Sequence, residues 1–232
     1  MGFMTHEQLK AGRLEVGLTQ VQAAERLGVS QPYLSQLEKG ERPITAEVAR
    51  SAATLYRLTA TALPILKSIA PRVPTNTGAL SRQLAGLGYP GFAHLRQSKA
   101  NPAAILLEAL VQEDLEVRLA EALPWVVLTY PDMDWPWLIR EVKLRNAQNR
   151  LGFIVAMALE LAAAQARFRP ALERIFPAAQ ELERARLVRE GTLCRESMPP
   201  AERDWLATTR SALASHWNLV TGLTADQLSY AS

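Results

Sequence analysis

The sequence predicts an all-α protein, with a small N-terminal helical domain followed by a larger, irregular helical bundle. Short segments near the N-terminus each begin with a Ser or Thr that can cap a helix. A stretch with two prolines and a glycine, 71–78, interrupts the chain, and apolar residues recur at helical spacing after it. With 232 residues, 48% of them hydrophobic and 21% charged, the chain has the composition of a globular protein that buries a core.

The N-terminal part divides into five predicted helices. Gly28 and Gly40 end the second and third, since glycine readily adopts the left-handed conformation that follows a helix. Each predicted helix is shorter than about 15 residues, a length that is marginal in isolation, so the five must pack together. The helices begin after Thr5, Thr19, Ser30 and Thr45, and the last passes through Leu63, Leu66 and Ile69.

The composition also predicts a domain boundary. Pro71, Pro74 and Gly78 disfavour a continuous helix and favour a linker. All five tryptophans follow this stretch, whereas the part before it has one phenylalanine and two tyrosines. We therefore expect domains at 1–72 and 79–232, joined by a linker at 73–78.

Positive charge is concentrated at the N-terminus. Residues 1–72 contain nine Lys or Arg and six Asp or Glu, a net charge of +3, whereas the remaining residues carry 17 of each sign. This distribution is compatible with a polyanion-binding head on a neutral body.

Residues 18–40 carry the pattern of a helix-turn-helix. Ala24 is small where two helices must approach closely, and Gly28 permits the left-handed turn between them. Val29, Leu34 and Leu37 can fill the angle between the helices. In this motif the N-terminal half of the second helix enters the major groove of DNA. The polar residues on that helix, which are the predicted base-reading residues, are Gln31, Tyr33, Ser35 and Gln36.

The same segment strongly resembles the DNA-binding domain of the Cro and phage-repressor family, also called the XRE family, over residues 1–72. The resemblance rests on Leu-Thr-Gln at 18–20, Leu-Gly-Val-Ser at 27–30 and Leu-Ser-Gln-Leu-Glu-Lys-Gly at 34–40. It implies a five-helix, lambda-repressor-like fold that binds a double-stranded DNA operator.

The resemblance also implies roles for individual residues. Gln20, which opens the second helix, corresponds to a glutamine that bonds a DNA phosphate. Gln31 and Gln36 correspond to residues that touch bases, although both could instead be solvated surface glutamines. Arg13 and Glu38 correspond to a structural ion pair between the first helix and the recognition helix, 31–39.

Further DNA contacts are expected at the ends of the recognition helix. Relatives carry a glutamine where this chain has Pro32, so we expect no base contact there. Tyr33 can stack on a sugar or a thymine methyl, or serve only as packing. We expect Ser30, Lys39 and Arg42 to contact phosphates, with ordinary solvated surface as the alternative for the two basic residues.

The C-terminal part of the sequence is also predicted to form helices. Asp134 is interpreted as a helix cap rather than as half of a metal site with Asp132, because proline follows it at position 136. Trp125–Tyr130 is an apolar run expected to be an extended connector or a brief strand. The apolar run at 151–159 is too short to cross a membrane, and is expected to be a central buried helix. The expected helices span 79–87, 101–123, 135–159, 170–177, 182–188 and 202–219, with a turn at 88–91.

No enzymatic motif occurs. The three histidines are isolated, and Cys194 alone cannot form a disulfide or a multi-cysteine zinc site. We therefore expect no catalytic residues, no metal and no cofactor, and a cytoplasmic protein without a secretory signal. Polar residues that could line a ligand pocket or partner groove, or could simply be solvated, are Arg145, Asn146, Gln148, Asn149 and Arg150.

Together these features predict a sequence-specific transcription regulator of double-stranded DNA, an autorepressor that reads the major groove with the helix 31–39. We expect a homodimer, because one such domain presents a small contact surface. The C-terminal body would dimerise it and sense a small-molecule effector. An alternative is an antitoxin that represses its own operon and neutralises a toxin protein, since Gly-Tyr-Pro-Gly-Phe at 88–92 distantly resembles regulators of toxin-antitoxin operons. A third hypothesis is that the protein is an enzyme with an additional DNA-binding domain.

Overall fold

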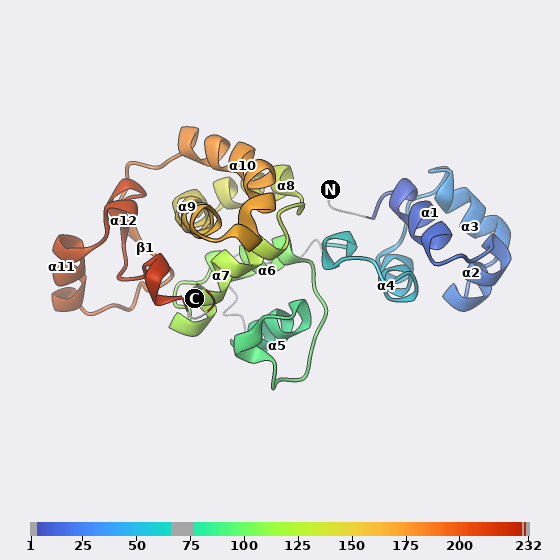
Figure 1. Ribbon diagram of the computed structural model, residues 1–232, viewed down its shortest axis with the longest axis horizontal. Helices are drawn as coiled ribbons and strands as arrows, with labels where there is room; N and C mark the ends of the chain where they lie inside the picture. The colour runs from blue at the N-terminus through green and yellow to red at the C-terminus, as the bar shows by residue number, and fades with distance from the viewer. Residues whose placement is uncertain (1–3, 66–76, 229, 231–232) are drawn as a thin grey trace. The chain divides into compact units, whose positions relative to one another are not determined.

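The computed structural model describes residues 4–65, 77–228 and 230 (Figure 1). The chain divides into two compact units, residues 1–68 and 69–232, which are described separately. Within the described residues the regular structure is helical, apart from a parallel pair of two-residue strands, β1 (Gly191–Thr192) and β2 (Leu219–Val220). The predicted all-α class is therefore confirmed.

Side-chain hydroxyls begin the four α-helices of the N-terminal unit. Thr5, Thr19, Ser30 and Thr45 accept hydrogen bonds from the backbone amide three residues on, at 3.1, 3.2, 3.4 and 3.3 Å. The four helices therefore start at the positions the sequence predicts. The elements are α1 (His6–Glu15), α2 (Gln20–Leu27), α3 (Gln31–Glu38), α4 (Ala46–Leu55) and the short 3-10 helix η1 (Ala60–Ala62).

The core of this unit is formed by one apolar stripe from each helix. Leu9, Leu34, Leu37 and Ala52 are fully buried. The predicted fifth helix, through Leu63, Leu66 and Ile69, lies mostly outside the described residues, and so does most of the predicted linker at 73–78.

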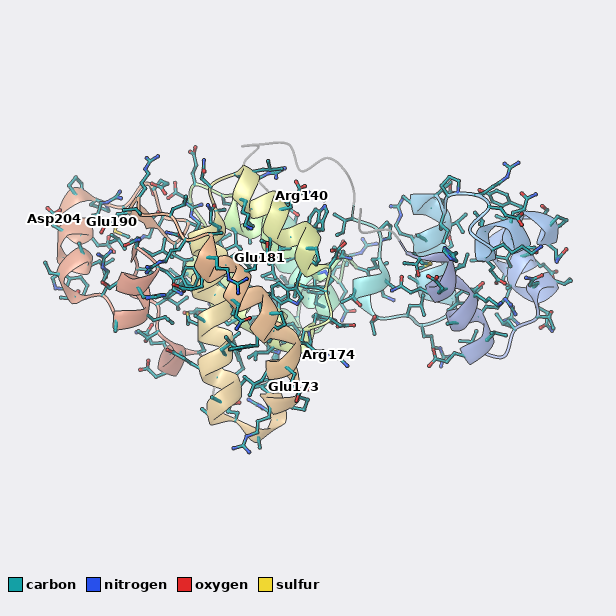
Figure 2. The ribbon with its side chains drawn as sticks, turned by 90° about the horizontal axis from the view of Figure 1, so that it is seen from above. Arg140, Glu173, Arg174, Glu181, Glu190 and Asp204 are labelled. Carbon is teal, nitrogen blue, oxygen red and sulfur yellow. The ribbon has the colours of Figure 1, made fainter. Side chains whose placement is uncertain are left out.

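The C-terminal unit is an irregular helical bundle around one buried helix. Its centre is α9, whose Leu151, Phe153 and Met157 are fully buried and which contacts α7, α8 and α10. Figures 1 and 2 show α9 and α10 side by side, and Glu181 of α10 accepts a 2.8 Å hydrogen bond from Lys143 of α8. The elements are α5 (Thr77–Leu87), η2 (Pro90–Phe92), α6 (Pro102–Leu110), α7 (Val117–Thr129), α8 (Trp135–Leu144), α9 (Gln148–Ala164), η3 (Ala166–Ala171), α10 (Leu172–Arg184), α11 (Pro200–Thr209), α12 (Ala212–His216) and η4 (Ala225–Gln227).

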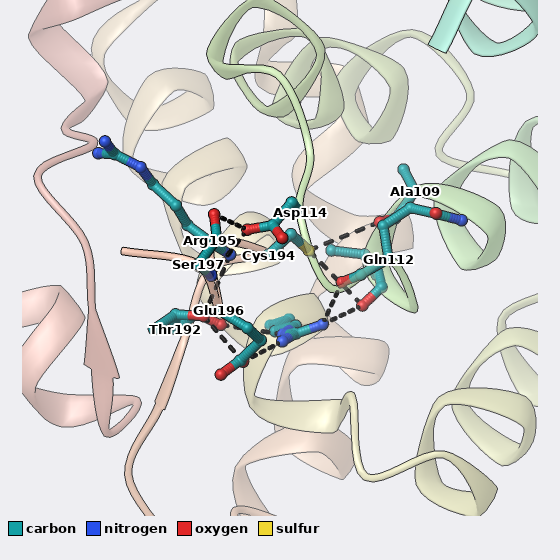
Figure 3. A network of polar contacts seen from close by, with 10 residues as sticks. Ala109, Gln112, Asp114, Thr192, Cys194, Arg195, Glu196 and Ser197 are labelled. Carbon is teal, nitrogen blue, oxygen red and sulfur yellow. Dashed lines mark hydrogen bonds and ion pairs between the residues drawn. The ribbon is translucent and has the colours of Figure 1, made fainter. Parts of the chain in front are cut away.

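The predicted helix over 101–123 is wrong, because the chain leaves the helix after Leu110 to pair with a distant segment. Asp114 forms an antiparallel bridge with Arg195, and the Leu115 amide donates to the Cys194 carbonyl at 2.8 Å. Figure 3 shows this contact region around Asp114, Thr192 and Glu196. The guanidinium of Arg150 donates to the Leu110 and Gln112 carbonyls, both at 2.9 Å, and so satisfies the end of α6.

Other boundaries also differ from the sequence prediction. The apolar run Trp125–Tyr130 is neither strand nor connector but the end of α7 and its cap, since an apolar run alone does not distinguish a buried helix from a strand. The predicted helix 135–159 breaks between α8 and α9 at Asn146, which has a left-handed φ of 56°. Asp134 caps α8 by accepting a 3.0 Å bond from the Trp137 amide, as predicted.

The last three predicted helices are also incorrect in extent. Pro177 lies inside α10 rather than at the end of a helix, and α10 ends at Arg184 rather than continuing to Val188. The predicted helix 202–219 is divided into α11, α12 and β2, because Ser211 caps a new helix by accepting from the Ala214 amide at 3.1 Å.

Close packing in the bundle depends on one glycine of α9. A Cβ built at Gly152 would lie 2.1 Å from a ring carbon of Trp217, which is buried. We predict that Gly152→Ala lowers the free energy of unfolding of this unit by about 1–3 kcal/mol or more, because the indole must move out of a packed core. Urea unfolding followed by tryptophan fluorescence measures this unit, since all five tryptophans lie in it.

The matched control is Gly191→Ala, where the nearest atom to an added Cβ is 4.0 Å away. Its unfolding midpoint should stay close to that of the unaltered protein. Equal destabilisation by the two alanines would show that the Gly152–Trp217 contact is not the cause.

Candidate nucleic-acid interface

The turn between α2 and α3 sets the angle of the outer helix. Gly28 has φ 69° and ψ 29°, and the Val29 amide donates to the Ala24 carbonyl at 3.0 Å. A residue with a Cβ adopts this left-handed conformation only at a cost, so glycine is favoured here. Leu34 and Leu37 fix the buried side of α3, which leaves its polar side outward.

A chain of polar side chains connects the three helices α1, α2 and α3. Arg13 donates to the two carboxylate oxygens of Glu38 at 2.6 and 2.9 Å, and its third nitrogen donates to the Leu18 carbonyl at 2.8 Å. The Gln20 amide donates to Glu38 Oε2 at 2.9 Å. The Gln31 amide donates in turn to Gln20 Oε1 at 2.8 Å. The ion pair therefore determines, through Gln20, how Gln31 is held at the start of α3.

Burial makes this ion pair obligatory. The side chains of Arg13 and Glu38 are 8% and 2% exposed. Burial alone opposes ionisation of Glu38, but hydrogen bonds from Arg13 and Gln20 outweigh it and hold the pKa of the carboxyl below its usual value. The hydrogen bond to Glu38 likewise raises the pKa of Arg13. The nearby Tyr56 is also buried, and desolvation, together with the negative charge of Glu38, raises its pKa to about 12.

The outward side of α3 keeps hydrogen-bonding capacity for a ligand. Gln31 uses one N–H on Gln20, so its carbonyl oxygen and second N–H stay available. Gln36 and Ser35 are half-buried, and their side chains make no hydrogen bond within the described part of the chain. Pro32 is exposed and offers no donor. The three residues Gln31, Ser35 and Gln36 thus present polar groups from one helix.

The structure pairs two of the predicted DNA-contacting residues with each other. The guanidinium carbon of Arg42 lies 5.9 Å from the ring centre of Tyr33, a cation–π distance. Lys39 lies at the C-terminal end of α3, where its exposed ammonium is 3.9 Å from the Glu41 carboxylate. Such a long, solvated ion pair contributes little, so Lys39 can exchange Glu41 for another anion.

Ser30 and Gln20 have structural partners and keep donors as well. The Ser30 hydroxyl oxygen accepts from the Tyr33 amide at 3.4 Å, and its proton is not used in that bond. Gln20 gives one N–H to Glu38 and retains the other. Both residues lie at helix N-termini, where backbone amides favour an anion such as phosphate.

The five polar residues singled out around the start of α9 are not all equivalent. Gln148 is buried and donates to the Ala185 carbonyl at 3.3 Å. Asn149 makes a pair of bonds with the Leu187 backbone, at 2.9 and 2.8 Å. Arg145 binds the carbonyl and carboxylate of Glu141, at 2.9 and 2.8 Å. Four of the five, Gln148 excepted, line a pocket of about 580 Å³.

A lone cysteine such as Cys194 can be a redox sensor or an inert buried thiol, and its surroundings distinguish the two roles. The thiol is fully buried, within 3.5 and 3.6 Å of the Ala109 and Leu110 carbonyls. Burial raises its pKa to about 11, which keeps it protonated and unreactive at neutral pH. This environment favours the inert interpretation over a redox sensor.

The hydrogen bonds and ring contact that connect the predicted residues were not predicted from the sequence. Gln20 and Gln31 open consecutive helices, and in a helix-turn-helix the starts of these two helices lie near each other; this signal could have predicted their contact. The Tyr33–Arg42 contact has no such signal, because Arg42 lies beyond the helix in an irregular segment.

Two kinds of feature are absent from the described residues. No helix there is both long and apolar enough to span a bilayer. No group of three or more His, Cys, Asp or Glu side chains there is placed to hold a metal ion.

Comparisons with known proteins agree with the geometry of the N-terminal unit. Residues 9–63 match the family model described as helix-turn-helix. A 97-residue segment, 42% of the chain, is 35% identical to a protein of Cereibacter sphaeroides named propionyl-CoA carboxylase regulator. The chain spans about a fifth of that relative's length, 21%. No solved structure matches the chain. Residues 9–63 are therefore a helix-turn-helix domain.

The buried carboxylate predicts how this unit responds to acid. Because the pKa of Glu38 is lower in the folded than in the unfolded protein, its ionised form stabilises the fold above its ordinary pKa of 4.5. That stabilisation is lost as the pH falls from there through the folded pKa. We predict that Glu38→Gln removes this part of the acid sensitivity, and lowers the free energy of unfolding at neutral pH by about 3–5 kcal/mol, because Arg13 stays buried without a counter-ion.

Urea unfolding followed by far-ultraviolet circular dichroism, between about pH 7 and about pH 3, measures both effects. Tryptophan fluorescence from the same samples separates the C-terminal unit. Glu25→Gln, at an exposed position of α2, is the matched control and should change stability by less than about 0.5 kcal/mol. An unchanged acid transition in Glu38→Gln would argue against a lowered pKa.

Proposed function

We propose that this chain, whose residues 9–63 form a DNA-binding helix-turn-helix domain, is a sequence-specific transcriptional regulator that reads the major groove with α3. The observation that carries the proposal is Gln31, held by Gln20 at the N-terminus of α3 with its carbonyl and one N–H unused. The regulator name of the Cereibacter sphaeroides relative supports the same conclusion.

The free groups of glutamine match one base in particular. In the major groove adenine presents an acceptor, N7, beside a donor, the N6 amino group. A glutamine amide offers a donor beside an acceptor, so it can bond both at once. Gln31 and Gln36 would each read an adenine in this way, while Ser35 and Tyr33 contact neighbouring groups. Holding Gln31 in advance reduces the conformational entropy lost on binding.

Phosphate contacts would come from the edges of the same surface. Lys39 and Arg42 provide charge, and Ser30 and Gln20 provide neutral donors at helix N-termini. These contacts position the domain without reading sequence. Because base-reading residues would affect specificity and phosphate-contacting residues would affect overall affinity, substitutions in the two groups can be distinguished by experiment.

One such domain offers a small contact area, so we propose that the protein acts as a homodimer. A two-fold dimer of this motif binds half-sites about 34 Å apart, on one face of the duplex. Occupying an operator in this way would block transcription, which makes an autorepressor in the cytoplasm the proposed role. Sedimentation analysis with and without operator DNA tests the dimer.

We predict that Gln31→Ala and Gln36→Ala each weaken operator binding by about ten- to a hundredfold, because each removes a pair of bonds to one base. An operator is first selected from a library of random duplexes, and affinity is then measured by fluorescence anisotropy. Affinity for a scrambled duplex should stay almost unchanged. Equal losses on operator and scrambled duplex would reject direct reading of bases.

The double variant Lys39→Ala/Arg42→Ala should behave differently. We predict that it weakens binding to operator and scrambled duplex alike. The slope of log affinity against log salt should fall by about two, because two phosphates lose their cationic partners. Exposed Arg26→Ala on α2 serves as the charge control, with little expected change in that slope. A selective loss on the operator would instead assign these two residues to base reading.

A further inference from the structure

We propose that the pocket of about 580 Å³ in the C-terminal unit binds a small phosphate-bearing anion through Arg189 and Arg203. Its volume lies within the roughly 300–1,000 Å³ of small-molecule sites. Residues from five separate parts of the sequence line it, including the end of α6, the start of α9, β1, α11 and β2. The proposal does not depend on DNA binding.

Most of the charged groups in the pocket are already neutralised. Arg150 donates to Glu196 at 2.8 Å and to three backbone carbonyls, those of Leu110, Gln112 and Thr192, at 2.9 Å each. Glu190 accepts from Arg210 at 2.8 Å. Arg145 binds Glu141. These groups hold the pocket walls together and have little capacity left for a ligand.

Arg189 and Arg203 differ from the other arginines of the pocket. Neither guanidinium makes a hydrogen bond or ion pair within the part of the chain that the structure describes, although both line the pocket. Arg203 is half-buried, at a position where an unpaired charge is less well solvated than on an open surface. A guanidinium presents parallel N–H groups that match the oxygens of a phosphate.

The rest of the lining adds positive potential with one opposing charge. The α9 helix begins at this pocket, with no side chain capping its first turn, so its dipole also favours an anion. Glu113 is the one lining carboxylate without a side-chain partner among the described residues. It opposes the binding of an anion, which gives the test a variant with the opposite sign.

Calorimetric titration of the 232-residue chain with inorganic pyrophosphate, at constant ionic strength, tests the proposal. We expect saturable binding that Arg189→Ala/Arg203→Ala weakens about tenfold or more, since charge-assisted bonds are lost. Glu113→Gln should strengthen it several-fold, because a repelling charge is removed. The gain in affinity cannot result from misfolding.

Two charge-matched controls exclude other basic surfaces. Arg174→Ala/Arg184→Ala removes two exposed arginines of α10, where Figure 2 shows Arg174 on the outer surface of the bundle. Lys39→Ala/Arg42→Ala removes the charges proposed to contact DNA. Both should bind pyrophosphate like the unaltered protein. Absence of binding, loss of binding in either control, or binding unaffected by the Arg189 and Arg203 substitutions would overturn the proposal.

Discussion

The N-terminal unit depends on one buried carboxylate. Glu38 lies almost fully out of water, so its charge must be balanced by side chains that reach it from other helices. Arg13 does so from α1 and Gln20 from α2. Satisfying one group thereby fixes three helices relative to one another, and the bond from Gln31 to Gln20 extends that order to the surface. The position of Gln31 on the candidate DNA-binding surface thus depends on the need to balance the buried charge of Glu38.

The elements of this unit were predictable because their signals are local. A hydroxyl at Thr19 or Ser30 bonds an amide three residues away, and Gly28 adopts a conformation set by its own backbone. The resemblance of 18–40 to known repressors predicted the position of α3 correctly. The hydrogen bonds from Gln20 depend on how two helices cross, and that information is not contained in either helix alone.

The C-terminal unit was predicted in class but not in detail, for the opposite reason. The end of α6 is set by hydrogen bonds between backbone carbonyls at that end and a side chain distant in sequence. Arg150, within α9, binds carbonyls at 110, 112 and 192, and so ends α6 and supports β1. Apolar periodicity continues through such a break, since it reports burial and not hydrogen bonding. The sequence thus identified α9 as the buried centre while merging helices on both sides of it.

In both units, the polar groups that hold the fold together differ from those that we propose to bind a ligand. The polar groups that hold the fold together use their donors and acceptors within the chain, as Arg13, Glu38 and Arg150 do. Each of these residues joins segments far apart in sequence. Gln31 has features of both kinds of group, since one N–H binds Gln20 while its carbonyl oxygen and second N–H are unused. Arg189 and Arg203 have no such commitment within the described residues, although they line a pocket whose walls are otherwise balanced. Unused capacity beside a rigid, satisfied network is what a binding site requires, because the network keeps the free groups in place while a ligand supplies their missing partners.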